Sequence, residues 1–147
     1  MFKKSLFLLL SSQYGFPKGF LGRYVGHRMD EQNEKQSDWV VSLLGIKKED
    51  KVLDIGCATG RDLKKISQRI NPEVLYGLDP SETMIQVAGE SLKKEISVGK
   101  VKIFKGYAEN PPFEPNFFNK IFAVHVVYFW KDLKKVFASL YRILQKE

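Results

Sequence analysis

The sequence predicts an α/β fold in which helices cover both faces of a parallel sheet of about four strands. Two observations lead to this prediction. Short apolar runs recur along the chain, and between them lie segments whose apolar residues repeat at helical spacing. Strands that alternate with helices form a parallel sheet with right-handed crossovers.

Four apolar runs are predicted to be the strands. Lys51 to Gly56 is short, apolar and ends in glycine, which indicates a buried strand. The second and third strands are predicted at Glu73 to Asp79 and Val101 to Gly106. The fourth, Lys120 to Phe129, is apolar almost throughout, so we expect it to be buried on both faces.

Four helices are predicted around these strands. They cover residues 31–44 with Gly45 as the stop, 61–70, 81–95 with Ser81 as the N-terminal cap, and 132–144. Each has one apolar face that should point inward. These faces carry Trp39, Val40, Leu43 and Leu44; Leu63, Ile66 and Ile70; Met84, Val87, Ala88 and Leu92; and Leu133, Val136, Phe137, Leu140 and Leu144.

The length of 147 residues predicts one domain, in which residues 1–45 form an N-terminal cap and helix and residues 46–147 form the core. The net charge of +7 is spread along the chain as lysine pairs, which favours a solvated basic surface over a nucleic-acid partner. The only cysteine, Cys57, excludes an intramolecular disulfide and fits a reducing cytoplasm. Two histidines and one cysteine do not make a typical metal site.

The N-terminus resembles a secretion signal, since two lysines precede the apolar run from Leu6 to Leu10. That run is shorter than the apolar core of a signal peptide, and no clear cleavage site follows. We therefore expect an apolar N-terminal flap, with membrane contact as the alternative.

A glycine-containing turn follows the first predicted strand, and an acidic residue ends the second. Gly56 and Gly60 bracket small Ala58, so the backbone there can approach a ligand closely. Asp79, at the end of the second strand, can accept hydrogen bonds from both hydroxyls of a ribose. The Gly-x-x-x-Gly spacing differs from the pattern that holds a pyrophosphate. A ligand with a ribose and no phosphate fits better, and S-adenosylmethionine is such a ligand.

Two motifs resemble those of class I S-adenosylmethionine-dependent methyltransferases. "VLDIGCATG" is similar to their first motif and "YGLDPSETMIQVA" to their second, in which the acidic residue holds the ribose. The stretch from Val101 to Trp130 resembles the third and fourth strands of the small-molecule branch, which includes quinone-biosynthesis C-methyltransferases. The resemblance implies a Rossmann-like fold, a small-molecule methyl acceptor and a set of cofactor-binding residues. That set is Asp54, Gly56, Cys57, Ala58, Gly60, Asp79, Pro80, Met84, Tyr107, Ala108, Glu109 and His125.

The chain departs from that family in two places. Tyr107 stands where an acidic residue commonly contacts the adenine; Glu109 or backbone groups would take over that contact. The family pattern continues after "YRIL" with three more strands, whereas this chain stops at "YRILQKE". The fourth strand would then be an exposed apolar edge, through which we expect self-association.

The tetrapeptide Asn110-Pro111-Pro112-Phe113 resembles the clamp that amino-methyltransferases use to hold a planar nitrogen. In those enzymes the clamp follows the fourth strand, but here it precedes that strand. We therefore interpret it as a rigid loop beside the adenine.

Three functions remain open from the sequence. The first is methyl transfer to a small molecule, with His125 and Tyr128 as the candidates for accepting a proton or orienting the substrate. The second is a truncated module that binds the cofactor with little or no turnover. The third, suggested by the net charge, is RNA methylation.

Overall fold

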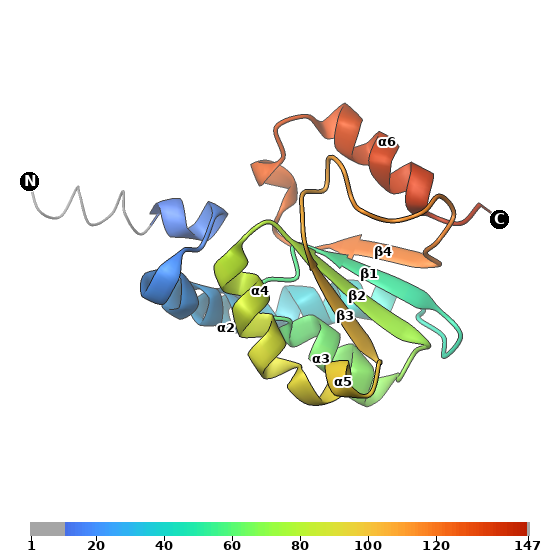
Figure 1. The fold of residues 1–147 in the computed structure, drawn as a ribbon, viewed down its shortest axis with the longest axis horizontal. Helices are drawn as coiled ribbons and strands as arrows, with labels where there is room; N and C mark the ends of the chain where they lie inside the picture. The colour runs from blue at the N-terminus through green and yellow to red at the C-terminus, as the bar shows by residue number, and fades with distance from the viewer. Residues whose placement is uncertain (1–10, 147) are drawn as a thin grey trace, which may run out of the picture.

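The computed structural model describes residues 11–146 and contains one four-stranded parallel sheet. The strands are β1 (Lys51–Ile55), β2 (Val74–Asp79), β3 (Val101–Lys105) and β4 (Lys120–Ala123). Their order is β3-β2-β1-β4, and the sheet is parallel throughout, which confirms the predicted α/β fold (Figure 1). The expected flap at Leu6 to Leu10 lies outside the described residues.

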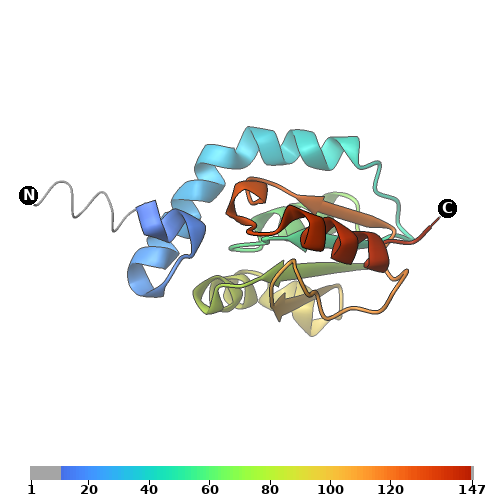
Figure 2. The ribbon, with the colours of Figure 1, turned by 90° about the horizontal axis from the view of Figure 1, so that it is seen from above.

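Helices cover both faces of the sheet. They are α2 (Gly19–Leu43), α3 (Arg61–Arg69), α4 (Glu82–Ser91), α5 (Lys93–Ser97) and α6 (Leu133–Ile143), with a short 3-10 helix η1 (Val127–Phe129) after β4. Residues 11–15 are helical as well. Figure 1 shows α6 on one side of the sheet and α3, α4 and α5 on the other. Figure 2 shows α2 running along the length of the molecule, from the N-terminal segment towards the start of β1.

The two faces of the sheet bury separate apolar cores. Under α3 and α4 the core is aliphatic and includes Val52, Leu63, Ile66, Leu75, Ala88 and Leu92. Under α6 it is rich in aromatic residues, and Tyr76 makes edge-to-face contacts with Phe113, Phe117 and Phe118. Both faces of the central strands are thereby removed from water, which is the main source of stability for a parallel sheet.

The fourth strand is shorter than the sequence predicted. It ends at Ala123, because His125 adopts a left-handed backbone conformation (φ +56°) that an extended strand cannot continue through. Only Phe122 of β4 is buried, so the expectation of a strand buried on both faces was wrong. Within residues 11–146 no strand pairs with the outer edge of β4, although Leu144 forms an isolated bridge with Phe118 just before it.

Two predicted helix faces are also corrected. Helix α2 begins at Gly19 rather than after Asp30, and its Trp39 and Leu43 are 64% and 66% exposed. Val40 and Leu44 pack against the core, as predicted. In α6, Leu133 and Phe137 are exposed, whereas Val136 and Ile143 are buried, because the sheet covers only one stripe of the helix.

The predicted helix over residues 81–95 is divided at Leu92 into α4 and α5. Its cap and its core face are as expected. The Ser81 hydroxyl accepts a hydrogen bond from the Met84 amide, and Met84, Val87 and Ala88 are buried. Among residues 11–146, no helix combines the length and apolar character needed to cross a membrane.

Candidate functional site

A cavity of about 350 Å³ lies at the carboxyl ends of β1, β2 and β4. In Figure 1 these strand ends point towards the N-terminal segment, which closes the cavity from that side. The volume falls within the range of small-molecule sites, and this edge is where parallel sheets bind ligands. All but one of the residues predicted to bind the cofactor line the cavity: Asp54, Gly56, Cys57, Ala58, Asp79, Pro80, Met84, Tyr107, Ala108, Glu109 and His125.

The turn after β1 depends on missing side chains. Gly56 has a φ of +77°, and its amide donates a hydrogen bond to the Leu78 carbonyl at 2.7 Å. A Cβ atom at this position would lie 2.4 Å from Cγ1 of Val126, so only glycine fits. Gly60 also has a φ of +77°, but a Cβ there would meet Leu92 rather than the cavity. Gly60 therefore contributes close helix packing and does not line the predicted site.

Asp79 links this turn to the start of α4. One carboxylate oxygen accepts a hydrogen bond from the Ala58 amide at 3.0 Å, and the other accepts one from the Ser81 amide at 2.8 Å. Burial raises the pKa of the carboxyl, and the two amide hydrogen bonds partly offset this rise. Each carboxylate oxygen has a second lone pair, so the group retains acceptor capacity for the hydroxyls of a ligand.

Asp54 lies on β1, the strand that pairs with the strand of Asp79. It is only 4% exposed, and its carboxyl has no hydrogen bond or ion pair among residues 11–146. Burial raises the pKa of this carboxyl well above its usual range, and the carboxylates of Asp62, Asp79 and Asp30 raise it further. An unpaired buried carboxylate is costly to the free protein. It would be compensated by a ligand that brings a positive charge or hydrogen-bond donors into the cavity.

Helix α2 supplies a wall of the cavity that the sequence reasoning missed. Met29, Asp30, Asn33 and Ser37 line it. The Asp30 carboxylate accepts a hydrogen bond from the Thr59 hydroxyl, and its carbonyl accepts one from Arg61. The helix is therefore attached directly to the turn that follows β1.

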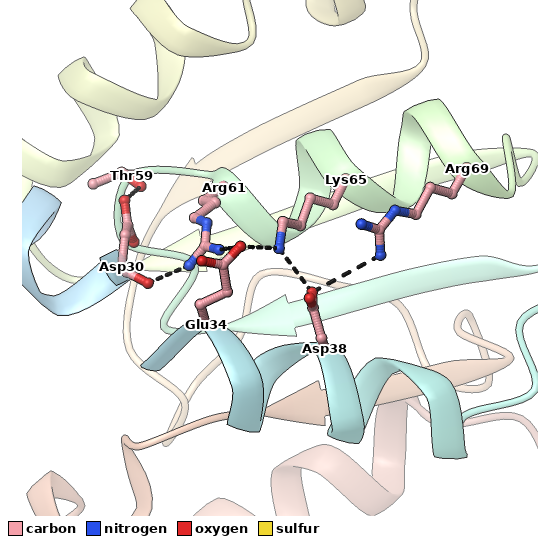
Figure 3. Close-up of polar contacts among 7 residues, drawn as sticks. All are labelled: Asp30, Glu34, Asp38, Thr59, Arg61, Lys65 and Arg69. Atoms are coloured by element: carbon pink, nitrogen blue, oxygen red, sulfur yellow. Dashed lines mark hydrogen bonds and ion pairs between the residues drawn. The ribbon is translucent and has the colours of Figure 1, made fainter. Parts of the chain in front are cut away.

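A series of ion pairs holds the rest of α2 in register with α3 (Figure 3). Glu34 pairs with Arg61 at 2.5 Å and with Lys65 at 2.9 Å, and Asp38 pairs with Lys65 at 2.8 Å. The acids at 30, 34 and 38 and the bases at 61, 65 and 69 each repeat every four residues, so both sets face one another. That matching period is visible in the sequence and could have revealed the contact.

The N-terminal segment covers the cavity and is attached to α4. The Pro17 carbonyl accepts a hydrogen bond from the Ser81 hydroxyl at 2.5 Å, and the Gly19 amide donates one to the Thr83 hydroxyl at 2.9 Å. Tyr14 and Phe16 belong to the cavity lining. This segment was not among the predicted site residues, because its sequence carries no ligand-binding motif.

A further wall of the cavity comes from the segment after β4, which lies beside the glycine turn. His125, Phe129, Trp130 and Lys131 line it. Tyr128, the second catalytic candidate, is 67% exposed and does not line the cavity, because its ring points outward and contacts Phe129. The local 3-10 turn, which the sequence did not predict, determines which of these aromatic rings point inward.

The tetrapeptide Asn110-Pro111-Pro112-Phe113 takes no part in the cavity. Asn110 is exposed, whereas Phe113 packs edge-to-face on Phe104 and Phe118. Arg142 of α6 donates hydrogen bonds to the carbonyls of Phe113 and Pro111 at 2.9 Å and 3.3 Å. The loop is thus tied to the aromatic core under α6 and lies outside the cavity.

Comparison with known proteins agrees with this geometry. A family model described as "Methyltransferase domain" matches residues 52–147. YrhH of Bacillus subtilis (strain 168), which bears the name of a methyltransferase, is 30% identical over 106 residues, covering 72% of this chain and 58% of YrhH. Cycloartenol-C-24-methyltransferase of Arabidopsis thaliana is 29% identical over 136 residues, covering 90% of this chain and 40% of that protein.

Among solved structures, a phosphoethanolamine N-methyltransferase of Haemonchus contortus, in complex with phosphomonomethylethanolamine and S-adenosylhomocysteine, matches with a TM-score of 0.69 and 28% identity. That match covers 76% of this chain and 26% of the other. The chain thus spans little more than half the length of YrhH and a smaller part of the larger enzymes. With its glycine turn, its acidic strand ends and the match over residues 52–147, the chain belongs to the class I S-adenosylmethionine-dependent methyltransferase family.

Proposed function

We propose that this chain binds S-adenosylmethionine in the cavity and transfers its methyl group to a small, largely apolar acceptor. The observation that carries the proposal is the pairing of two acidic groups at adjacent strand ends. Asp79 is held by two amides and keeps free lone pairs, while Asp54 is buried and unpaired. Such a pair suits a ligand with ribose hydroxyls at one place and a positive charge at another.

Three of the predicted residues would have specific parts in holding this ligand. The Asp79 carboxylate would accept the ribose hydroxyls, and Asp54 would accept hydrogen bonds from an ammonium group. The turn at Gly56 lets the backbone come close, because no side chain intervenes. The N-terminal segment would keep water out of the cavity.

The cofactor supplies an activated methyl group when bound, so the protein mainly needs to position the acceptor and exclude water. The acceptor would lie against Tyr14, Phe16, Phe129 and Trp130, which suits a compound with an apolar, planar surface. The similarity to cycloartenol-C-24-methyltransferase supports an apolar small molecule. A quinone-like ring is one compound of this class. An apolar wall of this kind gives no support to RNA as the acceptor.

A second function, cofactor binding with little turnover, is favoured by one observation. The outer edge of β4 has no paired strand within residues 11–146, and Phe129 beside it is 43% exposed. If the acceptor side is open to solvent there, the site would exclude water poorly and turn over slowly.

Calorimetric titration tests the cofactor assignment. We expect S-adenosylhomocysteine to bind with one-to-one stoichiometry and NAD and ATP not to bind, because the turn lacks a phosphate-binding pattern. Gly56→Ala should abolish binding by pushing Val126 and the turn apart. Gly45→Ala is the matched control, since Gly45 has a φ of +54° but nothing within 4 Å of an added Cβ.

Failure of the wild-type chain to bind S-adenosylhomocysteine would refute the proposal. Formation of S-adenosylhomocysteine from S-adenosylmethionine, measured with a panel of phenols, quinols and isoprenoids, then separates an enzyme from a binding module. Binding without turnover on any compound would support the second function.

A further inference from the structure

His125 stands at the place in the fold where an acceptor would meet the cofactor. It comes two residues after Ala123, the last residue of β4, and lines the same cavity as Asp54 and Asp79. Asp54 and Asp79 belong to β1 and β2, and β4 pairs with the other side of β1, so the three residues come from neighbouring parts of the sheet edge. His125 therefore lies beside the glycine turn, where the next residue, Val126, packs against Gly56, and it belongs to the wall that includes Phe129 and Trp130.

The backbone at His125 is held in a conformation that most residues avoid. Its φ is +56°, in the left-handed region. The residue after His125 fixes this turn. Val126 packs against Gly56, and the Val126 carbonyl accepts a hydrogen bond from the Phe129 amide at 2.9 Å. Strained residues that the surroundings hold in place are common at functional sites.

The imidazole ring of His125 has a nitrogen whose hydrogen-bonding capacity is not used. Nε2 of His125 is buried and has no hydrogen-bond partner among residues 11–146. A buried polar atom without a partner costs free energy, so native proteins seldom retain one without a reason. A ligand group that hydrogen-bonds to the ring would remove this cost.

A neutral imidazole is well suited to accept a proton near neutral pH. The wall around it is aromatic, which suits a planar ring as the neighbour. We propose that His125 accepts the proton of a ring-borne hydroxyl on the methyl acceptor, which makes the acceptor a phenol-class compound. This inference rests on the proposed function, because it assumes that the cofactor occupies the part of the cavity lined by Asp54 and Asp79.

The chemistry balances without any further reactant. Methylation of a hydroxyl forms an O–CH3 bond and breaks the S–CH3 bond, whose electron pair stays on sulfur. The hydroxyl proton passes to the unprotonated nitrogen of the imidazole. The ring later loses this proton to water, and the neutral methyl ether leaves.

The experiment uses the fact that the chain contains two histidines, His27 and His125. Imidazole ¹⁵N–¹H correlation spectra of the ¹⁵N-labelled protein are recorded with saturating S-adenosylhomocysteine, before and after addition of catechol or 4-hydroxybenzoate. His125→Asn and His27→Gln assign the two rings. Asparagine is chosen at 125 because it tolerates a left-handed backbone, so the turn after β4 should survive.

We expect the phenols to shift the His125 resonances and leave those of His27, which is exposed, unchanged. His125→Asn should bind S-adenosylhomocysteine with wild-type affinity. Where the wild-type chain turns over a phenol, His125→Asn should lower the rate by roughly a hundredfold or more, the usual contribution of a general base.

The outcomes distinguish failure of the proposed function from failure of the inference about His125. No binding of S-adenosylhomocysteine to the wild-type chain would refute the proposed function and this inference with it. Normal binding of S-adenosylhomocysteine with His125 resonances that no phenol moves would overturn the inference alone. Loss of S-adenosylhomocysteine binding in a folded His125→Asn variant would also overturn it, because the ring would then belong to the cofactor side.

Discussion

Replacement of Asp54 by asparagine should make the free protein more stable and its ligand complex weaker. In the native state burial raises the pKa of this carboxyl, so the native protein holds a proton that the unfolded chain has already released. Stability attributable to Asp54 therefore falls as the pH rises above the unfolded-state pKa of about 4. Asp54→Asn removes this penalty at neutral pH, and the difference should vanish below about pH 4.

The magnitudes follow from the burial and isolation of the group. An unpaired buried charge costs about 1–3 kcal/mol or more, so the variant should gain about that free energy of unfolding at neutral pH. A gain of about 2 kcal/mol raises the Tm of a chain of this size by roughly 4–8 °C. Loss of a charge-assisted hydrogen bond to the ligand ammonium costs about 1.5–3 kcal/mol, or roughly ten- to a hundredfold in Kd.

Urea denaturation over a range of pH and calorimetric titration with S-adenosylhomocysteine measure the two effects. Asp50→Asn is the matched control, since Asp50 is also buried but accepts a hydrogen bond from the Lys47 amide at 2.7 Å and lies outside the cavity. It should lose up to about 1 kcal/mol of stability and bind the ligand normally. An Asp54→Asn variant that is less stable at neutral pH and binds with wild-type affinity would contradict the reasoning, because the carboxylate would then serve the fold.

Four further perturbations test other parts of the structure. Asp79→Ala should weaken S-adenosylhomocysteine binding by about 1–3 kcal/mol through lost ribose hydrogen bonds, and unchanged affinity would remove Asp79 from the site. Asn110→Ala should leave both binding and methyl transfer unchanged, because the side chain is exposed outside the cavity; a large rate loss at normal affinity would restore the clamp interpretation. Lys65→Met, which separates α3 from the two carboxylates of α2, should lower the Tm at low salt, and this difference should shrink at high salt. It should also shrink as the pH falls below about 4, because the ion pairs lower the pKa of both carboxyls and the stabilisation is lost as these groups take up protons. We also propose that the chain self-associates along β4 and the exposed stripe of α6, so Phe137→Lys should lower the mass measured by light scattering, whereas Trp39→Lys on α2 should not; a monomeric wild-type chain would refute this.

The parts of the site that the sequence predicted are those with local signals. Gly56 and Asp79 each end an apolar run, and the carboxyl ends of neighbouring parallel strands must meet at one edge. Their joint position in the cavity therefore follows from the strand order alone. Gly60 shows the limit of such reasoning. It has the same left-handed backbone as Gly56, but a side chain at Gly60 is excluded by contact with Leu92 and not by a ligand.

The sequence by itself determined the α/β class, the approximate positions of the four strands and the glycine–acid pair, because periodicity, capping and strand-end chemistry are local properties. Only the tertiary structure decided where β4 stops, which rings of η1 face inward and that α2 forms a cavity wall. Gly22 and Gly26 weaken the helical signal of α2, yet Gly26 is needed because a Cβ there would lie 2.9 Å from the Met84 sulfur. Contacts between residues far apart in the chain set these features. An apolar pattern indicates that a residue is buried, but it does not indicate which residues it packs against.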